Sequence, residues 1–439
     1  MNDSILLLYA LAGAVLASLL ACVPALHIYN VAGLLILLGA GATDFLSPEA
    51  TAFLFLGLVT GYAVVNTVPG VFFAAPDDST LFVILPAQKY LMQRRGYEAV
   101  VLTGLGSLGG IVVLALLAPF ASRLLPPLQA ILQPHVPWIL AAVIAYMLMS
   151  EWPKGTDRAP TAWGKLAEAW VSLAAGLITF LLAGLLGLIL MYRSPVPVDM
   201  AYQGLLPAFV GLFAVPWIVQ NLLARIEIPP QHLSASVDVT PGQVARGVAA
   251  GAMGGLFAAF FPVVTGGIGG FLAGHATAQR DDRLFLISQG ASKVVYYVGG
   301  LLLFFVPGLH LTRGGMAWTL STLFSAHGPT WHLLATAAVM LAGGAAFFLL
   351  LGLSRGIIVL MKRWRYRSVS LATLGLLLTV VLGLTGPGGL LVCVAASGIG
   401  LIPVLWGSRR MNCMGVLLLP ITLNMFGASN TVAGWLGLL

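Results

Sequence analysis

The chain has 439 residues, of which 59% are hydrophobic and only 8% are charged. Soluble domains average about 45–50% and about 25% on these two measures, so this chain has too few polar side chains to cover a core in water. Its net charge of +7 is distributed over short loops, which is typical of cytoplasmic loops and not of a nucleic-acid surface. We therefore expect an all-α, multi-pass protein of the cytoplasmic (inner) membrane with the lipid bilayer as its surroundings.

The first apolar run covers residues 4–23 and is preceded by Asp3, without the basic residues of a secretory signal. We predict that it is the first helix of the mature protein. The later apolar runs predict a polytopic bundle of about 10–12 helices, some of them too short to cross the bilayer unbroken.

The two halves of the chain resemble each other. A shift of 238 positions aligns residues that determine backbone geometry: Pro24 with Pro262, Asp44 with Asp282, Gly61 with Gly299, and residues 68–70 with 306–308, both Val-Pro-Gly. Repeats of this kind build many transporter folds. We infer an N-terminal membrane repeat at residues 1–223, a polar linker at 224–242 and a C-terminal membrane repeat at 243–439.

Loop charges indicate how the repeats are related. Residues 88–95 carry three basic side chains and their counterpart at 327–332 carries none, whereas the loop around Arg123 is nearly uncharged and residues 355–367 carry five. Because basic loops stay in the cytoplasm, equivalent loops of opposite bias lie on opposite sides of the membrane. The pattern predicts inverted repeats. In that arrangement Gln88 and Trp364 lie on the cytoplasmic side, and Pro126 and Pro329 lie on the outer side.

Proline and glycine interrupt the apolar runs at corresponding places in both halves. The interrupted segments are residues 24–30, 69–80, 262–270 and 307–315. Such paired interruptions predict broken or re-entrant helices that meet at a binding site near the bilayer midplane. Loops between ordinary full-length helices are the alternative.

Four polar residues, Asp77, Asp78, Ser79 and Thr80, lie between strongly apolar stretches. Carboxylates in such a position are costly unless they are solvated, paired or bound to a cation. We predict a site for a coupling H⁺ or Na⁺, or for a polar substrate, with a helix N-cap at a wet loop as the alternative. We expect no other cofactor, because the three cysteines do not have the spacing of metal ligands.

Lys293 is the one charged residue in the run from 284 to 305. Since a lysine at the bilayer centre costs about 2.5–3.5 kcal/mol, we predict an anion contact or a counter-charge to Asp77 or Asp78. A lysine that extends to the membrane surface is the alternative. Further substrate-binding candidates flank the interruptions: His27, Asn30, Thr265, Gly266, Gly267, His310, Thr312 and Arg313.

Residues 71–110 include Ala-Pro-Asp-Asp-Ser-Thr at 75–80, Arg-Gly-Tyr-Glu-Ala at 95–99 and Gly-Ser-Leu-Gly-Gly at 106–110. This stretch resembles the signature region of the TctA family, the large permease subunit of tripartite tricarboxylate transporters, and especially its shorter archaeal-type members. Members of that family usually have Pro-Gly at two positions where this chain has Pro24-Ala25 and Pro262-Val263, so Ala25 and Val263 replace the expected glycines. The resemblance implies a cation-driven carboxylate permease that works with a small membrane subunit and a periplasmic binding protein.

We therefore expect a secondary transporter of a small organic anion. No hydrolase, metalloprotease or nucleotide-binding motif is present, so we do not expect an enzyme. A flippase for a lipid phosphate remains an alternative. A membrane-embedded enzyme acting on a lipid-linked substrate, with Asp77 and Asp78 as metal ligands, is another.

Overall fold

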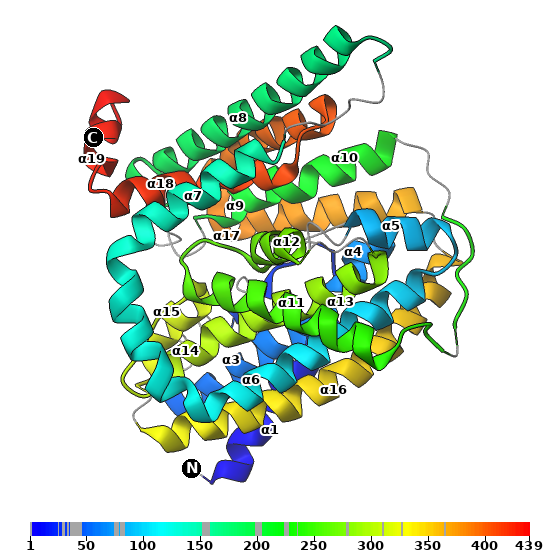
Figure 1. The fold of residues 1–439 in the computed structure, drawn as a ribbon, viewed down its shortest axis with the longest axis vertical. Helices are drawn as coiled ribbons and strands as arrows, with labels where there is room; N and C mark the ends of the chain where they lie inside the picture. The colour runs from blue at the N-terminus through cyan, green and yellow to red at the C-terminus, as the bar shows by residue number, and fades with distance from the viewer. Residues whose placement is uncertain are drawn as a thin grey trace. The chain divides into compact units, whose positions relative to one another are not determined.

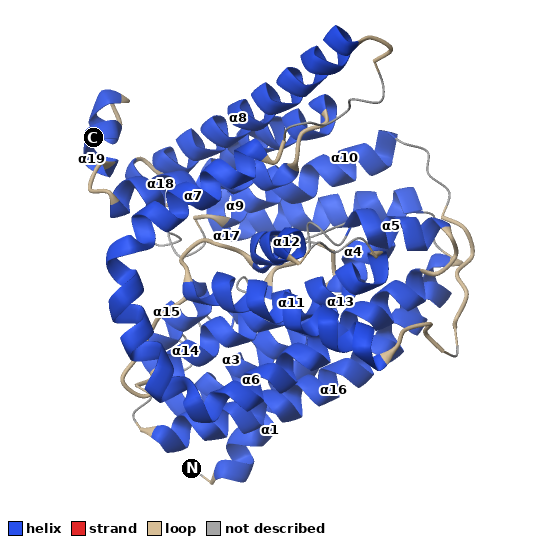
Figure 2. Cartoon of the chain, in the orientation of Figure 1, coloured by secondary structure: helices blue, strands red, loops and turns tan. Residues whose placement is uncertain are grey.

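The computed structural model describes these residues: 2–24, 26–28, 31–32, 35, 46–73, 79, 84–151, 159–197, 204–223, 228–234, 236–277, 281–309, 311–325, 328–363 and 366–439. Within them all regular secondary structure is helical (Figures 1 and 2). Seven helical segments in this part of the chain are long and apolar enough to cross a membrane, or eight if Arg410–Met425 and Ser429–Trp435 form one bent span. The prediction of an all-α polytopic membrane protein is confirmed.

The chain forms two compact units, one from Met1–Gln129 and Arg225–Thr373, the other from Ala130–Ala224 and Leu374–Leu439. Each unit thus combines a segment from each predicted repeat. The repeat boundaries at residues 223 and 243 stay a prediction, because compact units and sequence repeats divide the chain in different ways. Every described residue of the candidate site belongs to the first unit.

The helices of the first unit are α1 (Asp3–Leu20), α3 (Pro48–Val65), α4 (Thr67–Phe73), α5 (Ile84–Met92), most of α6 (Gly96–Leu132), α11 (Pro241–Phe260), α12 (Gly266–Ala276), α13 (Asp282–Val294), the π-helical turn η4 (Val295–Gly299), α14 (Gly300–Phe305), α15 (Gly314–Leu323) and α16 (Pro329–Met361). Polar caps fix several of their starts. Thr240 and Gln243 form a reciprocal capping box before α11, with Pro241 at the first helical position, where a missing N–H is harmless.

The second unit contains η1 (Gln133–His135), α7 (Val136–Met149), α8 (Ala162–Tyr192), α9 (Leu206–Phe209), the π-helical turn η3 (Val210–Ala214), α10 (Val215–Leu223), most of α17 (Tyr366–Trp406), η5 (Arg410–Met414), α18 (Gly415–Met425) and α19 (Ser429–Trp435). Glu151 is fully buried there and holds the start of η5. Its carboxylate accepts hydrogen bonds from the Arg409 N–H at 2.7 Å and the Asn412 amide at 3.0 Å.

Glycines bring helix backbones into direct contact in both halves of the first unit. A Cβ on Gly57 of α3 would lie 1.9 Å from the Ala10 carbonyl oxygen of α1. Correspondingly, a Cβ on Gly251 of α11 would lie 2.1 Å from the Ser288 carbonyl oxygen of α13. Small residues at helix crossings are the usual means of close packing in membranes. The α1–α3 and α11–α13 pairs therefore pack by the same device.

Each long helix of one half covers the helix pair of the other half. Helix α16 packs against α1 and α3. Helix α6 packs against α11 and α13, where the Ser107 hydroxyl donates to the Gly290 carbonyl at 3.3 Å and Gly109 meets Val248. The two halves are therefore interlocked within the first unit.

A helical hairpin occupies the predicted interruption at 262–270. Helix α11 ends at Phe260, α12 begins at Gly266 with Thr265 as its cap, and the backbones of Gly254 and Gly269 touch as α12 returns along α11. With 11 residues, α12 extends about 16 Å. A bilayer core is about 30 Å thick, so α12 cannot cross it alone.

The other interruptions differ in detail. At 307–315 the chain leaves α14, turns at Gly308 with φ 78° and starts α15 at Gly314 with the same φ. In the interrupted segment 69–80, α4 runs through Pro69 to Phe73, and of the remaining residues only Ser79 is described; the regular helix is also interrupted at one residue, Asn66, between α3 and α4. Pro69 is tolerated because it lies in the first turn of α4, where its missing N–H has no helical partner to lose. Much of the 24–30 segment lies outside the described residues.

Candidate functional site

Lys293 of α13 is completely enclosed by protein. Its ammonium donates to the Asn66 side-chain oxygen at 2.7 Å, to the Val64 carbonyl at 3.3 Å and to the Thr67 hydroxyl. These acceptors lie at the junction of α3, which ends at Val65, and α4, which starts at Thr67, where the regular helix is interrupted for one residue. This junction therefore holds the positive charge inside the protein.

Asn66 connects Lys293 to the predicted coupling-ion segment. Its side-chain amide donates to the Ser79 hydroxyl at 3.4 Å, and Ser79 is fully buried. Asp77, Asp78 and Thr80 lie outside the described residues. The substrate and coupling-ion candidates thus share one neighbour at the break between α3 and α4.

The glycine-rich start of α12 lies against the same turn of α13. A Cβ on Gly266 would be 3.0 Å from the Lys293 Cα, and the Ser292 hydroxyl donates to the Gly266 carbonyl at 2.8 Å. Thr265 and Gly267 are also buried. The Thr265 hydroxyl accepts a hydrogen bond from the Ile268 N–H at 3.4 Å. The positive N-terminal end of α12 is therefore next to Lys293, an arrangement that favours anions.

His27 contacts this region through the tyrosine side chains of Tyr297 and Tyr62. Its Nε2 lies 3.1 Å from the Tyr297 hydroxyl, and the Tyr62 ring centroid lies 5.2 Å from that of His27. Tyr297 belongs to η4, four residues after Lys293. π-helical turns inside helices often mark functional sites. Asn30, the other candidate at this interruption, lies outside the described residues.

Arg313 and Thr312 are placed farther along the helix axis. The Arg313 Cβ is 4.0 Å from where a Cβ of Gly300 would lie. Gly300 is seven residues after Lys293, or about 10 Å along a helix. Thr312 is exposed, and no contact within the described ranges joins Arg313 to Lys293. His310 lies outside the described residues.

Asn66, Thr67 and Tyr297 were not predicted from the sequence. Asn66 and Thr67 directly precede Val-Pro-Gly at 68–70, so two adjacent polar residues inside an apolar run were the available signal. Tyr297 follows Lys293 by four residues, which places both on one helix face.

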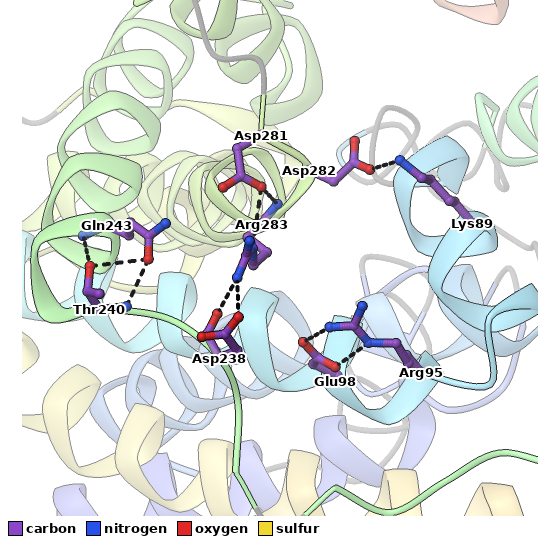
Figure 3. Close-up of polar contacts among 9 residues, drawn as sticks. All are labelled: Lys89, Arg95, Glu98, Asp238, Thr240, Gln243, Asp281, Asp282 and Arg283. Carbon is purple, nitrogen blue, oxygen red and sulfur yellow. Dashed lines mark hydrogen bonds and ion pairs between the residues drawn. The ribbon is translucent and has the colours of Figure 1, made fainter.

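The signature segment at 95–99 is built around a partly buried ion pair. Arg95 donates two hydrogen bonds to the Glu98 carboxylate, at 2.7 and 2.6 Å, and these bonds raise the pKa of Arg95. The neighbouring basic loop also meets acids of the second half: Figure 3 shows the ion pair of Lys89 with Asp282, and Arg283 bound to Asp238 at 2.7 Å. This region is a structural junction between the halves and the linker.

The fold and the site together define a polytopic helical membrane protein with a buried polar site around Lys293, between interrupted helices, an arrangement found in secondary transporters. Residues 7–415 match the Tripartite tricarboxylate transporter TctA family. The chain therefore belongs to this transporter family, as its signature residues predicted.

A relative is found in Methanocaldococcus jannaschii. This uncharacterised protein is 26% identical over 428 residues, which cover 95% of the present chain and 98% of the relative. No solved structure matches the chain.

Proposed function

We propose that the protein is the permease subunit of an inner-membrane tripartite carboxylate transporter and that Lys293 binds a carboxylate of its substrate. The enclosed ammonium of Lys293 is the observation that carries this proposal. Membership of a transporter family favours transport over the enzymatic alternative. A small membrane subunit and a periplasmic binding protein are the partners proposed with it.

The surroundings of Lys293 suit the exchange of ligands. The Asn66, Thr67 and Val64 oxygens are neutral acceptors. A substrate carboxylate forms a stronger, charge-assisted hydrogen bond with an ammonium than neutral oxygens do. The N-terminal end of α12 adds positive potential for the same carboxylate. An anion can therefore replace some of these neutral acceptors without leaving the lysine bare.

The proposed coupling ion, H⁺ or Na⁺, binds at residues 77–80. Ser79 lies one hydrogen bond from Asn66, so a cation there and an anion at Lys293 would be near neighbours. Their mutual attraction would make each bind better in the presence of the other, which is the energetic requirement for coupled transport. Uptake driven separately by a proton and by a sodium gradient distinguishes the two ions.

Substitution of Lys293 tests the anion site. We expect Lys293→Met to weaken citrate binding to the purified full chain about 10- to 100-fold, because a hydrogen bond to a charged group is lost. Stability should fall, since the Asn66, Thr67 and Val64 oxygens lose their buried donor. Lys293→Arg should restore binding only in part, because the guanidinium is larger and forked. Titration calorimetry and thermal unfolding in detergent measure both effects.

Lys89→Met is the matched control. It removes the same charge from a lysine whose side chain is 60% exposed, so citrate affinity should remain that of the wild type. Unchanged affinity in Lys293→Met would remove the lysine from the anion site.

A further inference from the structure

Gln289 is a buried amide without a partner. It lies on α13, one turn before Lys293, and is completely enclosed. Neither its Nε2 nor its Oε1 has a hydrogen-bond partner in the part of the chain that the structure describes. Most buried polar side chains are hydrogen-bonded, because an unsatisfied group loses its contacts with water and gains nothing in return. Gln289 therefore requires an explanation other than packing.

The position of Gln289 ties it to the candidate site. A Cβ on Gly270 of α12 would lie 2.7 Å from the Gln289 Nε2 and 2.9 Å from its Oε1, so only glycine leaves room for the amide there. Gln289, Lys293 and Tyr297 are spaced four residues apart, which places them along one face of α13 and η4. Lys293 reaches Asn66 and Tyr297 reaches His27. Gln289 completes this polar face against the glycine-rich helix α12.

We propose that Gln289 contacts the transported anion and determines its specificity by binding a hydroxyl group. This inference rests on the proposed function. A primary amide has two N–H donors and one acceptor oxygen, whereas an ionised carboxylate only accepts. A hydroxyl both donates and accepts, so it satisfies both ends of the amide. Residues four apart on a helix have Cβ atoms about 5–6 Å apart, which suits a small acid with a carboxylate at Lys293 and a hydroxyl at Gln289.

The chemistry predicts discrimination between acids that differ only in one hydroxyl. A site built to bind a hydroxyl rejects an analogue without it, because the buried amide is then left unsatisfied. Two probe pairs provide the comparison: citrate with propane-1,2,3-tricarboxylate, and malate with succinate. We expect the purified wild-type chain to bind the hydroxylated member of each pair at least about tenfold more tightly.

Gln289→Met should reduce this ratio to near one and leave the affinity for the acids without a hydroxyl nearly unchanged. Without ligand, Gln289→Met should also unfold at a higher temperature than the wild type, because an unsatisfied amide has been replaced by an apolar side chain of similar length. Ser288→Ala is the control: its buried hydroxyl likewise has no partner among the described residues, yet its backbone oxygen faces Gly251 of α11. This variant should keep the wild-type ratio.

Two results would overturn the role of Gln289: an unchanged ratio in Gln289→Met, or a lower unfolding temperature of the empty variant, which would show that the amide supports the fold. If the ratio is unchanged but Lys293→Met still weakens binding of all four acids, only the role of Gln289 fails. If the wild-type chain binds none of the four acids, the proposed function fails and this inference with it.

Discussion

Val263 has the backbone conformation of a glycine. It lies in the turn between α11 and α12 and has a φ of 56°. A β-branched residue is a clear outlier in this region, because its Cβ approaches the following carbonyl. The resemblance to the family predicts the glycine of a Pro-Gly element at this position. The turn therefore keeps the geometry of Pro-Gly although the sequence reads Pro-Val.

We expect Val263→Gly to stabilise the protein. Left-handed conformation costs an L-residue about 1–2 kcal/mol, and the greater freedom of glycine in the unfolded chain offsets about 0.5–1 kcal/mol of that gain. The net effect is a gain of up to about 1.5 kcal/mol. Thermal unfolding in detergent would measure it. Val263→Ala is the control, because its Cβ keeps the strain, and equal behaviour of the two variants would contradict the argument.

At the residue scale the sequence predicts which groups are unusual but not what they touch. Lys293 is conspicuous as a charge in an apolar run. Its partner Asn66 is 227 residues away, so only the packing of α3 against the region of α13 brings them together. Gln289 is neutral and does not stand out in composition. Its spacing from Lys293 acquires meaning only when α12 is known to cover that face.

At the scale of helices, composition and breakers predict most of the fold. The long apolar runs of the sequence form helices. Pro262 and Gly266 correctly predict the turn after α11, and Pro307 and Gly308 the turn after α14. The interruption at Asn66 and the helical conformation of Pro69 could not be predicted, because proline is compatible with the first turn of a helix as well as with a turn between helices. Which helices pair depends on glycine contacts between distant segments.

Gly57→Ala should destabilise the α1–α3 pair. The added Cβ meets the Ala10 backbone, which cannot rotate away, so the helices must move apart at a cost of about 1–3 kcal/mol. Gly251→Ala should have a similar effect on the α11–α13 pair. Thermal unfolding of the purified variants would measure both losses.

Gly344→Ala in α16 is the matched control for these glycines. Nothing lies within 4 Å of its Cβ position, so alanine should stabilise the helix by up to about 1 kcal/mol. The same substitution is thus expected to act with opposite sign at the two kinds of site. A gain in stability for Gly57→Ala would show that the close contact does not limit packing.

At the scale of the whole molecule, the inverted relation of the repeats stays a prediction that labelling can decide. In a variant without Cys22, Cys393 and Cys413, single cysteines are introduced at exposed positions: Gln93, Arg363, Ser122 and Thr330. Cysteines at 93 and 363 should react with an impermeant maleimide only in inside-out vesicles, since their loops are basic. Those at 122 and 330 should react in intact cells. Reaction of 93 and 330 from one side would exclude inverted repeats.

The enclosure of Lys293 has a consequence for how the protein is made. Synthesis proceeds from the N-terminus, so α3 and α4 enter the bilayer before α13 leaves the ribosome. A lysine that enters hydrocarbon alone is strongly disfavoured, but one that enters beside a finished helix end finds its acceptors in place. The first half of the chain then serves as a template on which the second half is inserted. The opposite order of synthesis would leave the lysine in lipid without Asn66 until half of the protein had followed.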